Sequence, residues 1–149
     1  GILAQNSQVK YSSPIQVGDS KDWTNVGMTP RSMYGIKSDG TMWVWGSNMD
    51  GRLGLNEAEA PGALGRSSPT EIHGGGTNWE TVVGRGNSVY ATKKDGTLWA
   101  WGMDNYGQLG MNTRTQLSSP TQVGSDSTWA RGYAKIAAMN TSFAALKLL

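Results

Sequence analysis

The feature that most constrains this chain is an internal repeat, because an 18-residue segment recurs 56 residues further on. Residues 39–56 (DGTMWVWGSNMDGRLGLN) and 95–112 (DGTLWAWGMDNYGQLGMN) share 10 identities without a gap. A self-match of this kind at a fixed period is the signature of a tandem-repeat fold, in which each repeat is one supersecondary unit. We therefore expect stacked copies of one unit.

Further matches extend the repeat in both directions. Residues 1–18 align without gaps on residues 107–124, and 9 of the 18 positions are identical. An aromatic residue stands 14 positions before a lysine three times, in the pairs Trp23 and Lys37, Trp79 and Lys93, and Tyr133 and Lys147. The motif Ser-Ser-Pro begins at residues 12, 67 and 118.

These matches predict a single propeller-like segment over residues 1–149. Its expected parts are the tail of a preceding unit (1–11), repeat 1 (12–56), repeat 2 (67–112) and a truncated repeat 3 (118–149). The third repeat stops before its Trp-x-Trp segment, so we expect its last strands to be missing.

The local pattern of each unit predicts antiparallel strands. Asp39-Gly40 lies between two apolar runs, and Asp-Gly favours a tight hairpin turn. In the next strand Trp43 and Trp45 share one face, while Met42 and Val44 share the other. A strand that is apolar on both faces belongs to a sheet between two other sheets.

Units of about 50 residues that form small stacked antiparallel sheets are typical of β-propeller blades. The expected fold is all-β, with blades of four-stranded antiparallel sheets, about three repeats and the last one incomplete. An open β-solenoid is the alternative, and it is disfavoured because its turns recur at shorter spacing.

Composition excludes several other classes. Glycine accounts for 21 of 149 residues, charged residues make up only 16%, and cysteine is absent. A helix-rich fold, a disulfide framework and a thiolate metal site are therefore disfavoured. The net charge of +2 is too small to predict a nucleic-acid partner. No apolar run long enough for a membrane span and no signal peptide is seen, so we expect no membrane partner.

No set of residues predicts catalysis. His73 precedes three glycines, as in the oxyanion loop of lipases, but it is the only histidine and no Gly-x-Ser-x-Gly occurs. No calcium loop, phosphate loop or dinucleotide fingerprint is present either. We therefore expect a protein that is not an enzyme, with no catalytic residues, no cofactor and no metal.

Residues outside the repeat are the better candidates for binding, since recurring residues are first explained by the scaffold. Two insertions, 56–66 and 125–132, supply the candidate binding residues Glu57, Glu59, Arg66, Trp129 and Arg131. Trp129 is expected to be exposed beside Arg131, a pairing typical of interface hot spots. The alternative is that Trp129 folds back onto its blade.

The ordered motif in residues 95–110, followed by Ser-Ser-Pro-Thr-Gln-Val at 118–123, resembles the regulator of chromosome condensation repeat family, in the style of bacterial and phage arrays. The resemblance implies a propeller of about seven blades. The family usually has histidine before the repeated serine, whereas this chain has Arg31, Asn87 and Thr141 there. That departure leaves the blade intact but gives no ground for transferring a specialised activity.

Three blades leave open apolar faces, so we expect a protein partner, either other copies of the chain or the rest of a longer propeller. The leading hypothesis is a non-catalytic interaction or structural module, which the resemblance places in a virion or an extracellular surface assembly. One alternative is a regulatory protein binder, exchange-factor-like or inhibitor-like, that acts through one rim. Another is a carbohydrate or nucleic-acid binder that uses exposed tryptophans.

Overall fold

The computed structural model describes residues 3–6, 12–57, 65–72, 74, 76–132 and 135–148. The first sheet, which we call blade 1, contains strands β1 (Trp23–Thr29), β2 (Ser32–Lys37), β3 (Met42–Gly46) and β4 (Arg66–Glu71). Blade 2 contains β5 (Trp79–Arg85), β6 (Ser88–Lys93), β7 (Leu98–Gly102) and β8 (Leu117–Gln122). Blade 3 contains β9 (Ile136–Ala138) and β10 (Phe143–Ala145).

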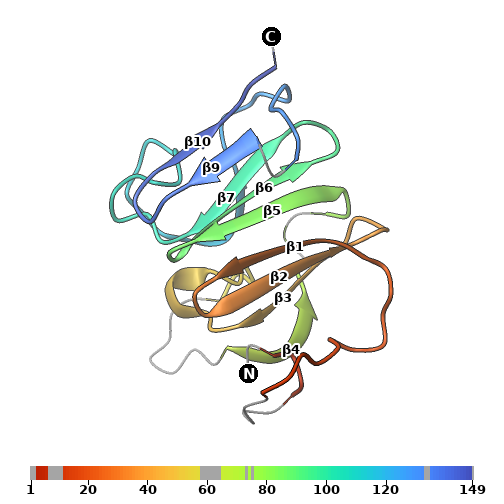
Figure 1. Cartoon of the computed structure of the whole chain (residues 1–149). Helices are drawn as coiled ribbons and strands as arrows, with labels where there is room; N and C mark the ends of the chain where they lie inside the picture. The colour runs from red at the N-terminus through yellow and green to blue at the C-terminus, as the bar shows by residue number, and fades with distance from the viewer. Residues whose placement is uncertain are drawn as a thin grey trace.

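The predicted all-β fold of four-stranded antiparallel sheets is confirmed. Blades 1 and 2 each pair their strands in chain order, β1-β2-β3-β4 and β5-β6-β7-β8, and every pair is antiparallel. Figure 1 shows the three sheets stacked in the order of the chain. The only helical element named in the described residues is the 3-10 turn η1 (Met49–Gly51), so none there could span a membrane.

The Asp-Gly-Thr turns explain why each blade contains the same central hairpin. Gly40 has φ 83° and Gly96 has φ 82°, a left-handed conformation that glycine adopts without strain. The Asp39 Oδ1 atom accepts hydrogen bonds from Thr41 N (2.9 Å) and Thr41 Oγ1 (2.7 Å). The same two bonds recur at Asp95 and Thr97, so the sequence identity reflects an identical turn.

The sequence repeats and the sheets are offset from each other. The Ser-Ser-Pro segment of repeat 2 lies in β4, the last strand of blade 1, and that of repeat 3 lies in β8 of blade 2. β4 and β8 are edge strands of their sheets, where a proline that cannot donate a backbone hydrogen bond is tolerated.

Side chains of both blades fill the interface between them. One core cluster joins Tyr34, Met42 and Val44 of blade 1 to Val82 and Trp101 of blade 2. The fully buried Trp101 ring packs edge-on to Tyr34, with ring centroids 6.4 Å apart. This tryptophan therefore joins blades, which fits the scaffold interpretation of the repeated Trp-x-Trp strand rather than sugar or base stacking.

The strands β1 and β5 approach too closely for any side chain larger than glycine at two positions. A Cβ on Gly27 would lie 2.6 Å from Val82 O, and a Cβ on Gly84 would lie 2.5 Å from Met28 O. Real Cβ atoms do not approach backbone oxygens this closely. These two glycines therefore set the spacing of the blades along their first strands.

One predicted equivalence between the repeats is wrong. The 14-residue spacing aligned Tyr133, a residue outside the described part of the chain, with Trp23 and Trp79, whereas the structure pairs Lys147 with Trp129. The Trp129–Lys147 bridge matches the pairs Trp23–Lys37 and Trp79–Lys93 in the other blades. The insertion at 125–132 therefore has residues on both sides of the aromatic residue, Trp129. A search for a constant spacing to Lys147 could not reveal this.

Candidate protein-interaction surface

The predicted binding residues fall into two separate groups. Glu57 forms an ion pair with Arg66, and Asn48 Nδ2 donates to Glu57 Oε2 at 3.3 Å. Arg66 lies opposite Gly46, at the end of blade 1 where β1 turns into β2. Glu59 lies outside the described residues. These partners tie the two ends of the first insertion together.

The second group lies at the opposite end of the blades. Arg131 Nη1 donates to Lys94 O at 2.7 Å, and its Nε lies 3.4 Å from Glu80 Oε2. Trp129 N donates to Gly96 O, and its half-buried side chain packs against the core cluster between blades 2 and 3. The expectation that Trp129 is exposed is therefore wrong, because it is the scaffold aromatic of blade 3.

The two rims of the stacked blades carry different cations. The strand registers place the turns after β1 and β5, with the loops after β3 and β7, on one rim, and the Asp-Gly turns on the other. The first rim, which we call the arginine rim, carries Arg31, Arg52, Arg66, Arg85 and Arg114. The lysines of the described residues lie toward the other rim, with Arg131.

Exposed side chains of the arginine rim have the composition of a protein interface. Arg31, Arg85 and Arg114 are exposed, Met49 is 50% exposed and Tyr106 is 66% exposed. Arginine, tyrosine and methionine are enriched at protein interfaces, whereas lysine is depleted there. The arginine rim is therefore the surface of the described chain best suited to a protein partner.

A hollow of about 300 Å³ opens on this rim between blades 1 and 2. It is lined by Pro30, Arg31, Met49, Arg52 and Asn87. Each of these five residues differs from its equivalent in the next repeat. The equivalents, in the same order as the lining residues, are Gly86, Asn87, Asn105, Gln108 and Thr141. The hollow is thus built from positions at which the repeats diverge.

The Arg52 side chain lies buried at this hollow. Its Nε donates to Met49 O at 2.7 Å, and its Nη2 lies 3.4 Å from Asp50 Oδ2. Asn87 Nδ2 donates to the same Asp50 oxygen at 2.5 Å. Burial lowers the pKa of Arg52, Asp50 offsets part of that effect, and the nearby charge of Arg31 lowers the pKa further. The hollow therefore holds like charges that an anion would stabilise.

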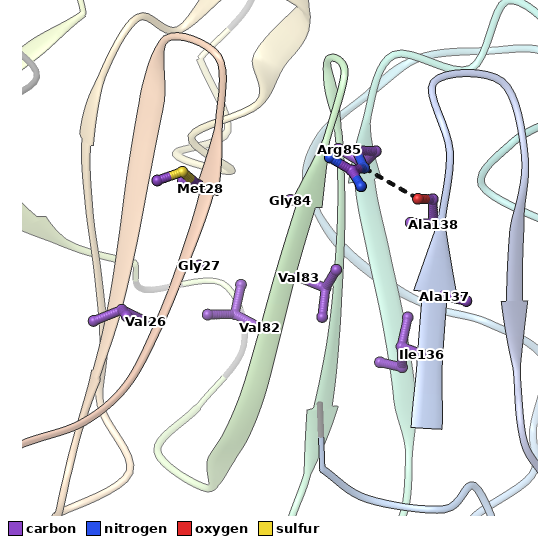
Figure 2. Close-up of a pocket in the computed structure, with 10 residues that line it drawn as sticks. All are labelled: Val26, Gly27, Met28, Val82, Val83, Gly84, Arg85, Ile136, Ala137 and Ala138. Atoms are coloured by element: carbon purple, nitrogen blue, oxygen red, sulfur yellow. Dashed lines mark hydrogen bonds between the residues drawn. The ribbon is translucent and has the colours of Figure 1, made fainter. Parts of the chain in front are cut away.

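A second depression, a groove of about 430 Å³, runs along the first strands of the three blades. Figure 2 shows Val82 extending from β5 toward β1, while Val26 and Met28 extend away from β5. Arg85 Nε donates to Ala138 O at 3.2 Å across the gap between β5 and β9. This groove is mostly backbone and aliphatic side chain, and it offers few groups that could recognise a specific ligand.

The sequence prediction placed the binding residues in the two insertions, so it did not include Arg31 and Arg52. The signal that could have found them is divergence between aligned repeats, at pairs such as Arg31 and Asn87 or Arg52 and Gln108. Such divergence marks positions that the scaffold does not fix.

No three His, Cys, Asp or Glu side chains of the described residues form a metal-binding group. His73, the residue of the hydrolase hypothesis, lies outside the described part of the chain.

Four-stranded antiparallel sheets stacked face to face, with their first strands side by side, define blades of a β-propeller. Residues 95–137 match the model of the Regulator of chromosome condensation (RCC1) repeat. This segment of the chain therefore matches the RCC1 repeat that its sequence motifs indicate, and the described sheets have the fold of β-propeller blades.

Relatives and a solved structure agree with this assignment. The chain is 33% identical over 89 residues to the probable E3 ubiquitin-protein ligase HERC3 of Homo sapiens, covering 59% of this chain and 8% of the ligase. It is 31% identical over 85 residues to the X-linked retinitis pigmentosa GTPase regulator homolog of Caenorhabditis elegans, covering 56% of this chain and 6% of that protein. The structure of Prp20p from Saccharomyces cerevisiae superposes with a TM-score of 0.70 at 13% identity, covering 91% of this chain and 33% of Prp20p. The chain thus spans a small part of these proteins.

Proposed function

We propose that this chain is a non-catalytic protein-interaction module that binds its partner through the arginine rim. The observation that carries the proposal is the gathering of exposed arginine, methionine and tyrosine on one rim, at positions where the repeats diverge. Residues that repeat are used to stack the blades, so the divergent rim is the part left to specify a partner.

Proteins of this fold support the proposal. Yeast Prp20p was solved together with a study of its binding to Gsp1p and histones, and Kap60 was solved bound to the same protein. RCC1-like propellers therefore bind protein partners. A regulatory protein that binds its partner through one rim is the function that best fits the arginine rim. A virion or surface-assembly role, and the location that goes with it, stay predictions.

The test compares two double variants of the chain on a resin. Arg85→Ala with Tyr106→Ala removes exposed side chains of the arginine rim, and Lys21→Ala with Lys94→Ala is the matched control at the other rim. Proteins captured from a lysate of the source cells are quantified by mass spectrometry. We expect at least one protein that is held by the wild type and the control and lost by the rim variant. Equal capture by all three forms would contradict the proposal.

We also propose that the open face of blade 1 binds the blade 3 end of a second copy. Val26 and Met28 are each 59% exposed on this face, whereas Val82, the repeat equivalent of Val26, is fully buried by blade 1. The blade 3 end exposes Leu146 and Leu148, so both ends of the stack offer apolar surface. The docking mode has a precedent within the chain, because blade 2 already presents this face to blade 1.

Light scattering over a range of concentrations tests this second proposal. We expect the mass of the wild type to rise above that of one chain as concentration increases, and Val26→Glu to keep the mass at one chain. A wild type that stays at the mass of one chain at high concentration would contradict it.

A further inference from the structure

We propose that the hollow between blades 1 and 2 binds the carboxylate of an aspartate or glutamate side chain of a protein partner, with Arg31 and Arg52 as its ligands. The inference rests on the proposed function, since it names the chemical group that the arginine rim recognises. It is tested separately below.

The charges around the hollow favour an anion. Two arginines, Arg31 and Arg52, line the hollow, whereas the one carboxylate bonded to its lining residues, Asp50, already accepts from Asn87 and Arg52. No side-chain hydrogen bond or ion pair of Arg31 is found among the described residues, so its fork of donors is available. Arg52 is 1% exposed, and reduced solvent contact strengthens the attraction between its charge and an entering anion.

The hydrogen bonds that recur in both blades at this position do not use the Arg52 side chain. The backbone oxygen of Arg52 accepts the structural hydrogen bonds, from Tyr34 OH at 2.9 Å and from Trp101 Nε1 at 2.9 Å. In blade 2 the backbone oxygen of Gln108 accepts the equivalent bond from Tyr90 OH at 2.8 Å. A neutral glutamine thus serves the scaffold at this position. The buried guanidinium of Arg52 is an added cost that a ligand would offset.

The surroundings favour a protein carboxylate over a nucleic-acid phosphate. Pro30 and Met49 give the hollow apolar walls, which suit the aliphatic stem of an acidic side chain. The equivalents of the two arginines at blade 2 are the neutral Asn87 and Gln108, so the cationic pair does not recur at the next blade. Nucleic-acid binding draws on several phosphates along a backbone, and this pair is not repeated at the equivalent positions of blade 2 as such a track would require.

The probes are the blocked peptides acetyl-Gly-Glu-Gly-amide and acetyl-Gly-Gln-Gly-amide, which differ only in the carboxylate. Each is titrated into the ¹⁵N-labelled full chain while the arginine Nε–H signals are followed by NMR. We expect the glutamate peptide to shift the Arg31 and Arg52 signals with half-saturation on the order of millimolar. Arg31→Ala, and Arg52→Gln, which copies Gln108, should each weaken binding by about tenfold or more. Lys94→Ala, at the other rim, should leave it unchanged.

Three results would overturn the inference. They are equal shifts with the glutamine peptide, unchanged binding in both arginine variants, and at least tenfold tighter binding of phenyl phosphate, which would indicate a phosphate-bearing ligand. Loss of these shifts with intact rim-dependent capture would reject the carboxylate pocket alone. Intact shifts without rim-dependent capture would reject the partner-binding role of the rim but support the carboxylate pocket.

Discussion

Val26 and Val82 occupy the same place in successive blades, and their burial differs because only one faces a neighbouring blade. Val82 is fully buried, whereas Val26 is 59% exposed. Replacing Val82 with alanine removes two methyl groups from a buried site, which costs about 1.6 kcal/mol by transfer and about 2–3 kcal/mol once the cavity is included. The same change at Val26 costs about 0.6 kcal/mol, because little of its surface is buried.

The two variants control for each other. Both lie in the first strand of a blade, so changes in strand propensity and in the unfolded chain largely cancel. Urea unfolding at low protein concentration, followed by tryptophan fluorescence, should place the midpoint of Val82→Ala about 1 M below that of Val26→Ala, with equal slopes. If a second copy covers that face, as proposed above, the loss of stability caused by Val26→Ala should grow with protein concentration.

Equal losses of stability at low concentration would refute this reasoning. That result would mean that Val26 is covered as fully as Val82 within one chain, or that blade 1 contributes nothing to the burial of Val82. A difference in slope instead of midpoint would show that the two blades unfold separately.

Other predictions follow from comparing the blades. Asp104→Asn should raise the free energy of unfolding by about 1 kcal/mol, because one oxygen of this buried carboxylate has no hydrogen-bond partner in the described chain. Asn48 serves the same turn in blade 1, so the amide fits there. A lower urea midpoint for the variant would contradict this prediction. Burial raises the pKa of Tyr90 to about 12. The contribution of Tyr90 to the free energy of unfolding is therefore full below pH 10 and is lost as the pH rises through 12. Tyr90→Phe should therefore lose less stability than the wild type between pH 10 and 12 in urea titrations, and parallel losses would count against this. Gly84→Ala should cost about 1–3 kcal/mol, since its Cβ would lie 2.5 Å from Met28 O; an unchanged thermal midpoint would show that β1 and β5 can separate freely.

The scaffold could be predicted because its determinants are local and occur twice. Asp39-Gly40-Thr41 is read from sequence as a turn, since the carboxylate, the positive φ and the hydroxyl act within three residues. The alternation of Trp43 and Val44 likewise fixes both faces of one strand. Neither inference needs knowledge of distant contacts.

The candidate site could not be predicted in the same way, because it forms where separate blades meet. Arg31 and Asn87 belong to different repeats, and only the stacking of blades brings them to one hollow. The Trp129 error has a related cause, since a loop of changed length moved the aromatic position relative to Lys147. Spacing within one repeat contains no information on either point.

The internal repeat also separates what the fold requires from what it permits. At residues 52 and 108 the backbone oxygen makes the structural bond in both blades, and the side chain differs. A buried arginine beside a second arginine carries a desolvation cost, which its hydrogen bond to Met49 O and its ion pair with Asp50 offset in part. The hydrogen bond that the two blades share at this position therefore does not account for the guanidinium of Arg52, and this is why we propose a ligand for that group.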